Sequence, residues 1–159
     1  MTVVDVRDRA LIERFLRRRP AVHPYELGDR DDFFWPHTRW LTWQPEGRIE
    51  QLALLYDEND PTVLLALAEP PEESATSLLR SLAAQLPTRL YAHLSPGLVP
   101  ALAPSLLPTS EQVPDRKLGL VDRARLDVPG IDGVELLTAT ELDEVERFYE
   151  HAYPGTWFQ

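Results

Sequence analysis

The chain has 159 residues, no cysteine, only 7 glycines and a formal net charge of −10. This length allows one domain, or one domain and part of another, because domains usually hold about 100–200 residues. The lack of cysteine excludes disulfides and thiolate metal sites and favours a cytoplasmic protein. The acidic balance argues against nucleic acid as a partner, since that binding needs Lys and Arg on the phosphates.

Membrane signals are absent from the sequence. The first ten residues lack the apolar core of a secretory signal. The longest apolar run, 63–68, is far too short to cross a bilayer. We therefore expect a cytoplasmic protein that does not bind membranes.

The N-terminal part of the chain predicts two helices. Apolar residues recur at helical spacing over 8–18, and Pro20 then stops the helix. A second, shorter helix is expected over 22–27, where Gly28 ends it. The arginines at 17–19 close the first helix, where cations complement the helix dipole, and we prefer this structural role to an anion site.

Strands and helices alternate in the middle of the chain. Short turns separate predicted strands at 38–44, 48–56 and 62–68, so these strands should form an antiparallel meander. An amphipathic helix is expected over 70–86, and alternation of apolar and polar residues predicts a strand over 89–94. The remaining expected elements are a short helix over 98–106 and a hairpin made by 109–113 and 117–122.

These elements predict an α/β (α+β) fold, a mixed sheet flanked by helices in the order α-α-β-β-β-α-β-α-β-β. Residues 3–6 would have to serve as a poor first strand. The first domain should span 1–123, and the Pro- and Gly-containing segment 124–133 reads as a linker.

A second domain should begin at 134, so that 134–159 supplies only its first strand and helix. The strand is expected over 134–137, and Thr138 with Glu141 has the capping-box spacing that starts a helix. The last segment of the chain, 152–159, then contains three large aromatic residues. Because such clusters are usually covered, we expect the chain to be truncated and able to form a homodimer through this end.

The element order and four short phrases resemble the N-terminal region of bacterial two-lobed GNAT family N-acetyltransferases. The phrases are HPYELGD at 23–29, FFWPHT at 33–38, YAHLSPG at 91–97 and AYPGTWF at 152–158. In such proteins a degenerate GNAT lobe precedes a second lobe that carries the acetyl-CoA site. The resemblance implies acetyl transfer from acetyl-CoA to a small amine, with the second lobe of the same polypeptide as the partner of the first.

The family signature for acetyl-CoA is Arg/Gln-x-x-Gly-x-Gly/Ala, between the fourth strand and the next helix. This place is occupied by Ala68, Glu69, Pro70, Pro71, Glu72, Glu73 and Ser74. The two prolines lack N–H donors, no glycine permits a close approach, and the glutamates repel a polyanion. We expect no cofactor in this chain, whereas the full-length parent would bind acetyl-CoA beyond residue 159.

Catalytic residues cannot be assigned from the sequence, but five residues are candidates for an acceptor groove. By the resemblance, Trp35, His37 and Trp40 border that groove; the alternative, which we prefer, is that this aromatic segment forms core. Tyr91 and His93 share one face of a strand near the acceptor, or else form a polar pair at a lobe interface, which we also prefer. The four histidines are isolated in sequence, so a metal site is unsupported.

Three functions follow from these observations. The leading one is the degenerate lobe of an N-acetyltransferase, inactive alone, with a structural role or a role in shaping the acceptor groove. The alternatives are a non-enzymatic α/β module that binds a protein partner, and a complete single-lobe acetyltransferase with an altered cofactor loop. Acetyl-CoA binding separates the third function from the others, and the coding sequence after Gln159 separates the first from the second.

Overall fold

The computed structural model describes residues 3–69, 72–103, 105–109, 113–114, 133–135 and 137–154. The chain divides into two units, Met1–Gly119 (unit 1) and Leu120–Gln159 (unit 2). Residues 124–132 of the predicted linker 124–133 and most of the predicted hairpin at 109–122 lie outside the described residues.

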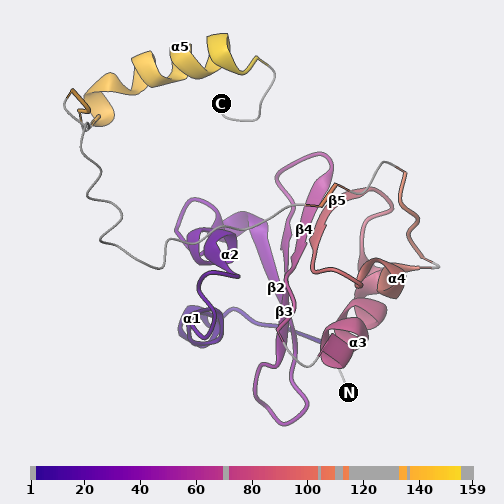
Figure 1. Cartoon of the computed structure of the whole chain (residues 1–159). Helices are drawn as coiled ribbons and strands as arrows, with labels where there is room; N and C mark the ends of the chain where they lie inside the picture. The colour runs from indigo at the N-terminus through magenta and orange to yellow at the C-terminus, as the bar shows by residue number, and fades with distance from the viewer. Residues whose placement is uncertain are drawn as a thin grey trace. The chain divides into compact units, whose positions relative to one another are not determined.

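Unit 1 is built on a five-stranded sheet with the strand order β1-β2-β3-β4-β5 (Figure 1). The first four strands pair antiparallel, and β5 pairs with β4 in parallel. The mixed α/β class expected from the sequence is therefore confirmed. The strands are β1 (Val3–Asp5), β2 (Thr38–Trp43), β3 (Gln51–Tyr56), β4 (Thr62–Ala66) and β5 (Leu90–Leu94).

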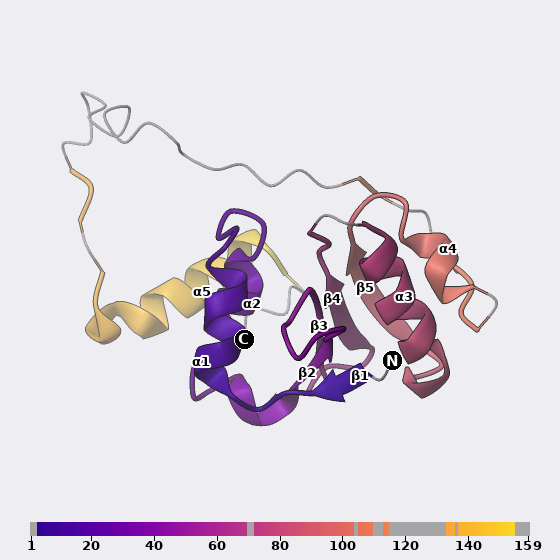
Figure 2. The same cartoon turned by 90° about the horizontal axis from the view of Figure 1, so that it is seen from below.

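Helices cover both faces of this sheet. The helices α1 (Arg9–Leu16) and α2 (Pro24–Gly28) lie on one face, and α3 (Glu72–Leu82) and α4 (Val99–Leu102) lie on the other (Figures 1 and 2). The described residues of unit 1 also form two 3-10 turns, η1 at Trp35–His37 before β2 and η2 at Ala83–Gln85 after α3.

The start and the buried side of α1 follow from its sequence. The Asp8 carboxylate accepts hydrogen bonds from the N–H groups of Ala10 and Leu11, at 2.9 and 3.0 Å, and so caps the helix. Ile12 and Leu16, four residues apart, point to the same side and are fully buried. One apolar stripe therefore packs α1 onto the sheet.

Two separate cores result, one on each face of the sheet. On the α3 face, leucines of the strands pack against Ala75, Leu78, Leu79 and Leu82 of the helix. On the α1 face, the fully buried Trp40 packs with strand leucines and with the apolar stripe of α1. Because strand side chains alternate between faces, a central strand such as β3 contributes to both cores.

Most predicted elements of unit 1 are present and shorter than expected. The strand predicted over 48–56 begins only at Gln51, and the helix predicted over 98–106 covers Val99–Leu102. The helix expected over 70–86 is α3 followed by η2. Because the closing hairpin falls mainly outside the described residues, the complete GNAT order is not established.

Unit 2 contains η4 (Ala139–Glu141) and α5 (Leu142–Ala152). The expected capping box is confirmed: Thr138 N–H donates to Glu141 Oε2 at 2.6 Å, and Thr140 N–H donates to Thr138 Oγ1 at 3.2 Å. None of the residues of α5 is buried.

The strand expected over 134–137 is not formed at the positions that the structure describes. Val134, Glu135 and Leu137 belong to no strand of the sheet. A strand requires backbone partners on a neighbouring strand, and no described residue of unit 2 supplies them. Within the described ranges, no helix is long and apolar enough to span a bilayer.

The α3 core can be tested with a matched pair of leucines. Leu79 is 1% exposed and packs in this core, whereas Leu107 is 74% exposed. We expect Leu79→Ala to lower the free energy of unfolding by about 2–5 kcal/mol, and Leu107→Ala to change it by less than about 0.5 kcal/mol. Urea denaturation followed by circular dichroism measures both, and equal effects would contradict the described packing.

Candidate functional site

The segment that leads from β4 to α3 lies at the carboxyl end of the parallel pair β4 and β5. Ligands of α/β sheets usually bind at this end of the strands. The segment is also where the GNAT resemblance would place a cofactor loop. Its bonding therefore decides what unit 1 can hold there.

Ser95, which directly follows β5, connects the ends of β4 and β5 by hydrogen bonds. Its N–H donates to the carbonyl oxygen of Ala66 at 3.1 Å, and its Oγ accepts a hydrogen bond from the N–H of Ala68 at 2.9 Å. The hydrogen bonding between the strands is thus prolonged by one side chain. The Ala68 N–H is bonded within the protein.

Gln51 on β3 occupies the next position along the same segment. Its side chain is almost fully buried, and its Oε1 accepts a hydrogen bond from the N–H of Glu69 at 3.1 Å. Its Nε2 donates to the Glu69 carbonyl oxygen and, at 3.3 Å, to Ser74 Oγ. One side chain therefore satisfies both backbone groups of Glu69 and reaches the first turn of α3.

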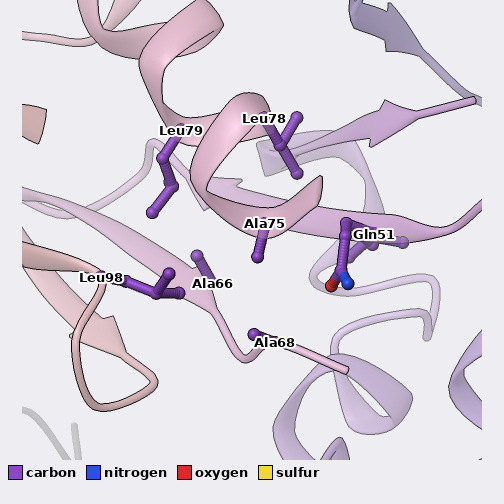
Figure 3. Close-up of a pocket in the computed structure, with 8 residues that line it drawn as sticks. Gln51, Ala66, Ala68, Ala75, Leu78, Leu79 and Leu98 are labelled. Atoms are coloured by element: carbon purple, nitrogen blue, oxygen red, sulfur yellow. The ribbon is translucent and has the colours of Figure 1, made fainter. Parts of the chain in front are cut away.

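A small cavity lies beside this Gln51 side chain. Figure 3 shows its amide close to Ala68 and Ala75, with Leu78, Leu79 and Leu98 around the space. The cavity volume is about 10 Å³, which is room for one water molecule. The described lining cannot admit a larger ligand without moving side chains.

The carboxylate of Glu69 points into the protein and meets a buried histidine. Glu69 Oε1 lies 3.3 Å from His23 Nε2, and Glu69 Oε2 lies 3.3 Å from an Arg18 guanidinium nitrogen. On the other side of the ring, His23 Nδ1 lies 3.1 Å from Glu26 Oε1. His23 and Glu26 are fully buried, and the Glu69 side chain is 10% exposed.

These contacts form a chain of ionisable side chains that runs from the buried Glu26, His23 and Glu69 to the partly exposed Arg18. The contact between His23 Nε2 and Glu69 Oε1 is close enough for an ion pair, but its alignment does not make a hydrogen bond. Within the described residues, His23 Nε2 and Glu69 Oε1 therefore have no hydrogen-bond partner. The arrangement fixes the segment after β4 against the α1 and α2 layer.

The contacts of Glu69 change one prediction from the sequence. The sequence predicts that Glu69 repels a polyanion, yet its carboxylate is buried and lies next to Arg18 and His23. Pro70 and Pro71 lie outside the described residues. Sequence reasoning treated His23 as isolated; its spacing to Glu26, one helical turn away, is the signal that could have found the pair.

Two of the candidate groove residues, Trp35 and Trp40, pack against other side chains of the protein. Trp40 is fully buried and stacks on Trp35, with ring centres 5.7 Å apart. The guanidinium groups of Arg7 and Arg9 each lie 4.5 Å from the centre of the Trp35 ring. Trp40 is thus a core residue, and Trp35 joins that core to the arginines before and in α1.

The third residue of this aromatic segment, His37, lies at the surface. Its Nδ1 is 2.6 Å from Glu58 Oε2, and its ring packs edge-on against Tyr56 with centres 6.4 Å apart. Phe34 contacts the same Tyr56 ring at 5.8 Å. Tyr56 is therefore the centre of a surface cluster that the sequence did not indicate.

Tyr91 and His93 lie on the same face of the sheet as this cluster. Their rings contact each other at 5.0 Å, and Tyr91 is 57% exposed. The strand register places Tyr56, Val63 and Tyr91 directly opposite one another on β3, β4 and β5. The structure thus brings His37, Tyr91 and His93 to one face of the sheet, where Trp40 is buried in the core.

Carboxylates surround Tyr56. Burial, followed by the nearby charges of Glu58, Asp29 and Asp57, raises the pKa of the Tyr56 phenol above its usual range. Burial also raises the pKa of Asp29 to about 6, with further contributions from Glu26 and Asp31. The field at this surface is negative and favours cations.

The structure does not indicate a metal site in the segment after β4 or at the surface around Tyr56. Across the residues that the structure describes, no group of three or more His, Cys, Asp or Glu side chains could hold a metal ion.

Comparisons of the chain with models of protein families, with curated proteins and with solved structures find no match. The function is therefore inferred from the bonding of the segment after β4 and from the surface around Tyr56.

The anchoring role of Gln51 is testable by truncation. Gln51→Ala leaves the buried N–H and carbonyl groups of Glu69 without partners, so we expect the free energy of unfolding to fall by about 2–4 kcal/mol. Gln85→Ala is the matched control, because Gln85 is exposed on η2 and should change stability by less than about 0.5 kcal/mol. A Gln51→Ala protein as stable as this control would refute the anchoring role.

Asp29 gives a prediction about pH. Its folded pKa of about 6 lies above the ordinary aspartate pKa of 3.8, so between these pH values the folded state holds a proton that the unfolded state has lost. Stability from this group is thus highest below about pH 4 and falls as the pH rises to about 6. Asp29→Asn removes this loss.

We expect Asp29→Asn to match the wild type below about pH 4 and to be about 1–2 kcal/mol more stable above about pH 6, allowing for partial solvent screening. Chemical denaturation across this range measures the difference. Asp60→Asn, at a carboxylate that is 92% exposed, is the control and should show no such trend. A destabilised Asp29→Asn protein at pH 7 would contradict the assigned electrostatics.

Proposed function

We propose that unit 1 is a lobe of a GNAT-like N-acetyltransferase that does not itself bind acetyl-CoA. The parent enzyme transfers the acetyl group of acetyl-CoA to an amine, and its cofactor site belongs to a second lobe of the same polypeptide. In this proposal unit 2 contributes the first helix of that second lobe. The proposal combines the resemblance of the sequence with the bonding of the segment after β4.

One observation carries the proposal. Loops that bind a pyrophosphate between a strand and a helix offer free backbone N–H groups to it. Here the N–H of Ala68 donates to Ser95 Oγ, and the N–H of Glu69 donates to Gln51 Oε1. A phosphate would have to displace both protein acceptors, and Glu69 is further held by Arg18 and His23.

Unit 1 then has a structural role and helps to shape the acceptor groove. Of the five candidate residues, His37, Tyr91 and His93 keep surface that an acceptor could contact. Trp40 and Trp35 stack on each other and pack in the core on the same face of the sheet. We assign no catalytic residue to this chain.

The second candidate function, a non-enzymatic module that binds a protein partner, has an observation of its own. Phe33 is 75% exposed and Tyr91 is 57% exposed, on a surface that also carries several carboxylates. Large exposed aromatic side chains commonly mark interfaces.

Calorimetry with acetyl-CoA tests the leading proposal. We expect no saturable binding to the 159-residue chain at acetyl-CoA concentrations up to about 1 mM, whereas typical cofactor sites bind in the micromolar range. Micromolar binding to this chain would instead favour a single-lobe acetyltransferase.

The gene supplies an independent check. The coding sequence after Gln159 should contain Arg/Gln-x-x-Gly-x-Gly/Ala within about 100 residues, the size of one domain. A fusion of the chain with that sequence should bind acetyl-CoA. Absence of the motif would refute the proposal of a two-lobed enzyme and favour the protein-binding module.

A further inference from the structure

We propose that the surface around Tyr56 is a docking site for a basic segment of another protein, one that presents arginine or lysine side chains. The site consists of an aromatic stripe, defined as Phe33, Phe34, Tyr56, Tyr91 and His93, and of the carboxylates beside it. This inference rests on exposed rings and charges and does not require the acetyltransferase proposal.

The aromatic stripe consists of two groups of rings on one face of the sheet, with Val63 of β4 between them. Phe33 and Phe34 contact each other at 5.0 Å, edge to face, and Phe34 contacts Tyr56 at 5.8 Å. From Tyr56 the register leads through Val63 to Tyr91, because these residues stand opposite one another on one face of the sheet. The Tyr91 and His93 rings complete the stripe.

Both ends of the stripe are open to solvent in the described part of the chain. Phe33 at one end is 75% exposed, and Tyr91 at the other is 57% exposed. A fold that needed these rings for its own core would have buried them, as it buried Trp40. Exposed aromatic area of this kind is typical of a surface that another molecule covers.

The negative charge beside the aromatic stripe favours a positively charged partner. Asp29, Asp57 and Glu58 lie close enough to raise the pKa of the Tyr56 phenol, and the pKa of Asp29 is itself raised to about 6. An arginine or lysine placed here would meet the carboxylates and also the negative faces of the rings. It would relieve the repulsion that Asp29 experiences from Glu26 and Asp31.

Among the described residues, no ion pair places an arginine on Asp29 or Asp57. Arg9 pairs with Asp32, Arg89 with Asp60 and Arg30 with Glu13, and Glu58 is paired with His37. A purely apolar partner would bury the carboxylates without counter-charges, which is costly. A nucleic acid would be repelled by them. A basic polypeptide segment is the partner whose chemistry fits.

A labelled peptide of alternating glycine and arginine serves as the probe, with fluorescence anisotropy as the measurement on the full chain. We expect binding with a Kd below about 100 μM at low salt, weakening as salt is added. The same peptide with glutamate in place of arginine should not bind. A Kd above about 1 mM for the arginine peptide would overturn the proposal.

Variants separate a specific site from attraction by the net charge of the chain. Phe33→Ser and Tyr91→Ser alter exposed rings, so the fold should persist, and each should weaken peptide binding by about 3-fold or more. Phe148→Ser is the matched control on α5, where the ring is 60% exposed, and should leave the Kd unchanged.

A charge-matched pair completes the design. Asp57→Asn combined with Glu58→Gln should weaken binding by about 10-fold, whereas Asp143→Asn combined with Glu144→Gln, on α5, should weaken it by less than about 2-fold. Equal losses from the two pairs would show net-charge attraction alone and refute the site. The acetyl-CoA titration does not bear on this outcome, so the two proposals fail separately.

Discussion

The side chain of Gln51 and the backbone of Glu69 form the contact on which the arrangement of unit 1 depends. A buried amide must be hydrogen-bonded, and Gln51 meets this requirement by binding the N–H and the carbonyl group of a single residue. These hydrogen bonds fix the backbone of the segment after β4. In this conformation the Glu69 carboxylate lies next to His23 and Arg18.

Glu69 consequently links the two helical layers at one end of the sheet. Its backbone is bonded on the α3 side, where Gln51 also reaches Ser74, and its carboxylate is paired on the α1 and α2 side. Breaking either set of contacts exposes buried polar groups, so the two sets support each other. A sheet end that usually serves as a ligand site is used here for the stability of the fold.

The surface that we propose for contacts with other molecules lies on the α1 face of the sheet. There, aromatic rings are exposed beside carboxylates that repel one another, which is an arrangement that attracts cations. The same face contains His37, Tyr91 and His93. An acceptor groove and a docking surface for a basic segment are therefore compatible uses of one surface.

Local pattern was sufficient to predict most elements of unit 1. Asp8 and Pro20 bound α1, and the turn residues after Tyr56 separate two strands of the meander. The sites depend on contacts between distant segments, which spacing does not reveal. His23 meets Glu69 only because α2 packs near the end of β4, and Tyr56 meets His37 only through the pairing of β2 with β3.

For the strand expected over 134–137, local pattern predicts an element that the described residues do not form. Its apolar residues suit a strand, but a strand forms only where a neighbour offers backbone partners. The helix that follows needs no such partner for its backbone, and its capping box suffices to start it.

Amide hydrogen exchange at Ala68 and Glu69, measured by NMR with and without acetyl-CoA, tests the central claim most directly. Both amides should exchange slowly, because Ser95 and Gln51 accept their hydrogen bonds, and neither their exchange rates nor their chemical shifts should change when acetyl-CoA is added. Fast exchange in the free protein, with protection and shift changes on adding acetyl-CoA, would show an open cofactor loop and contradict the account.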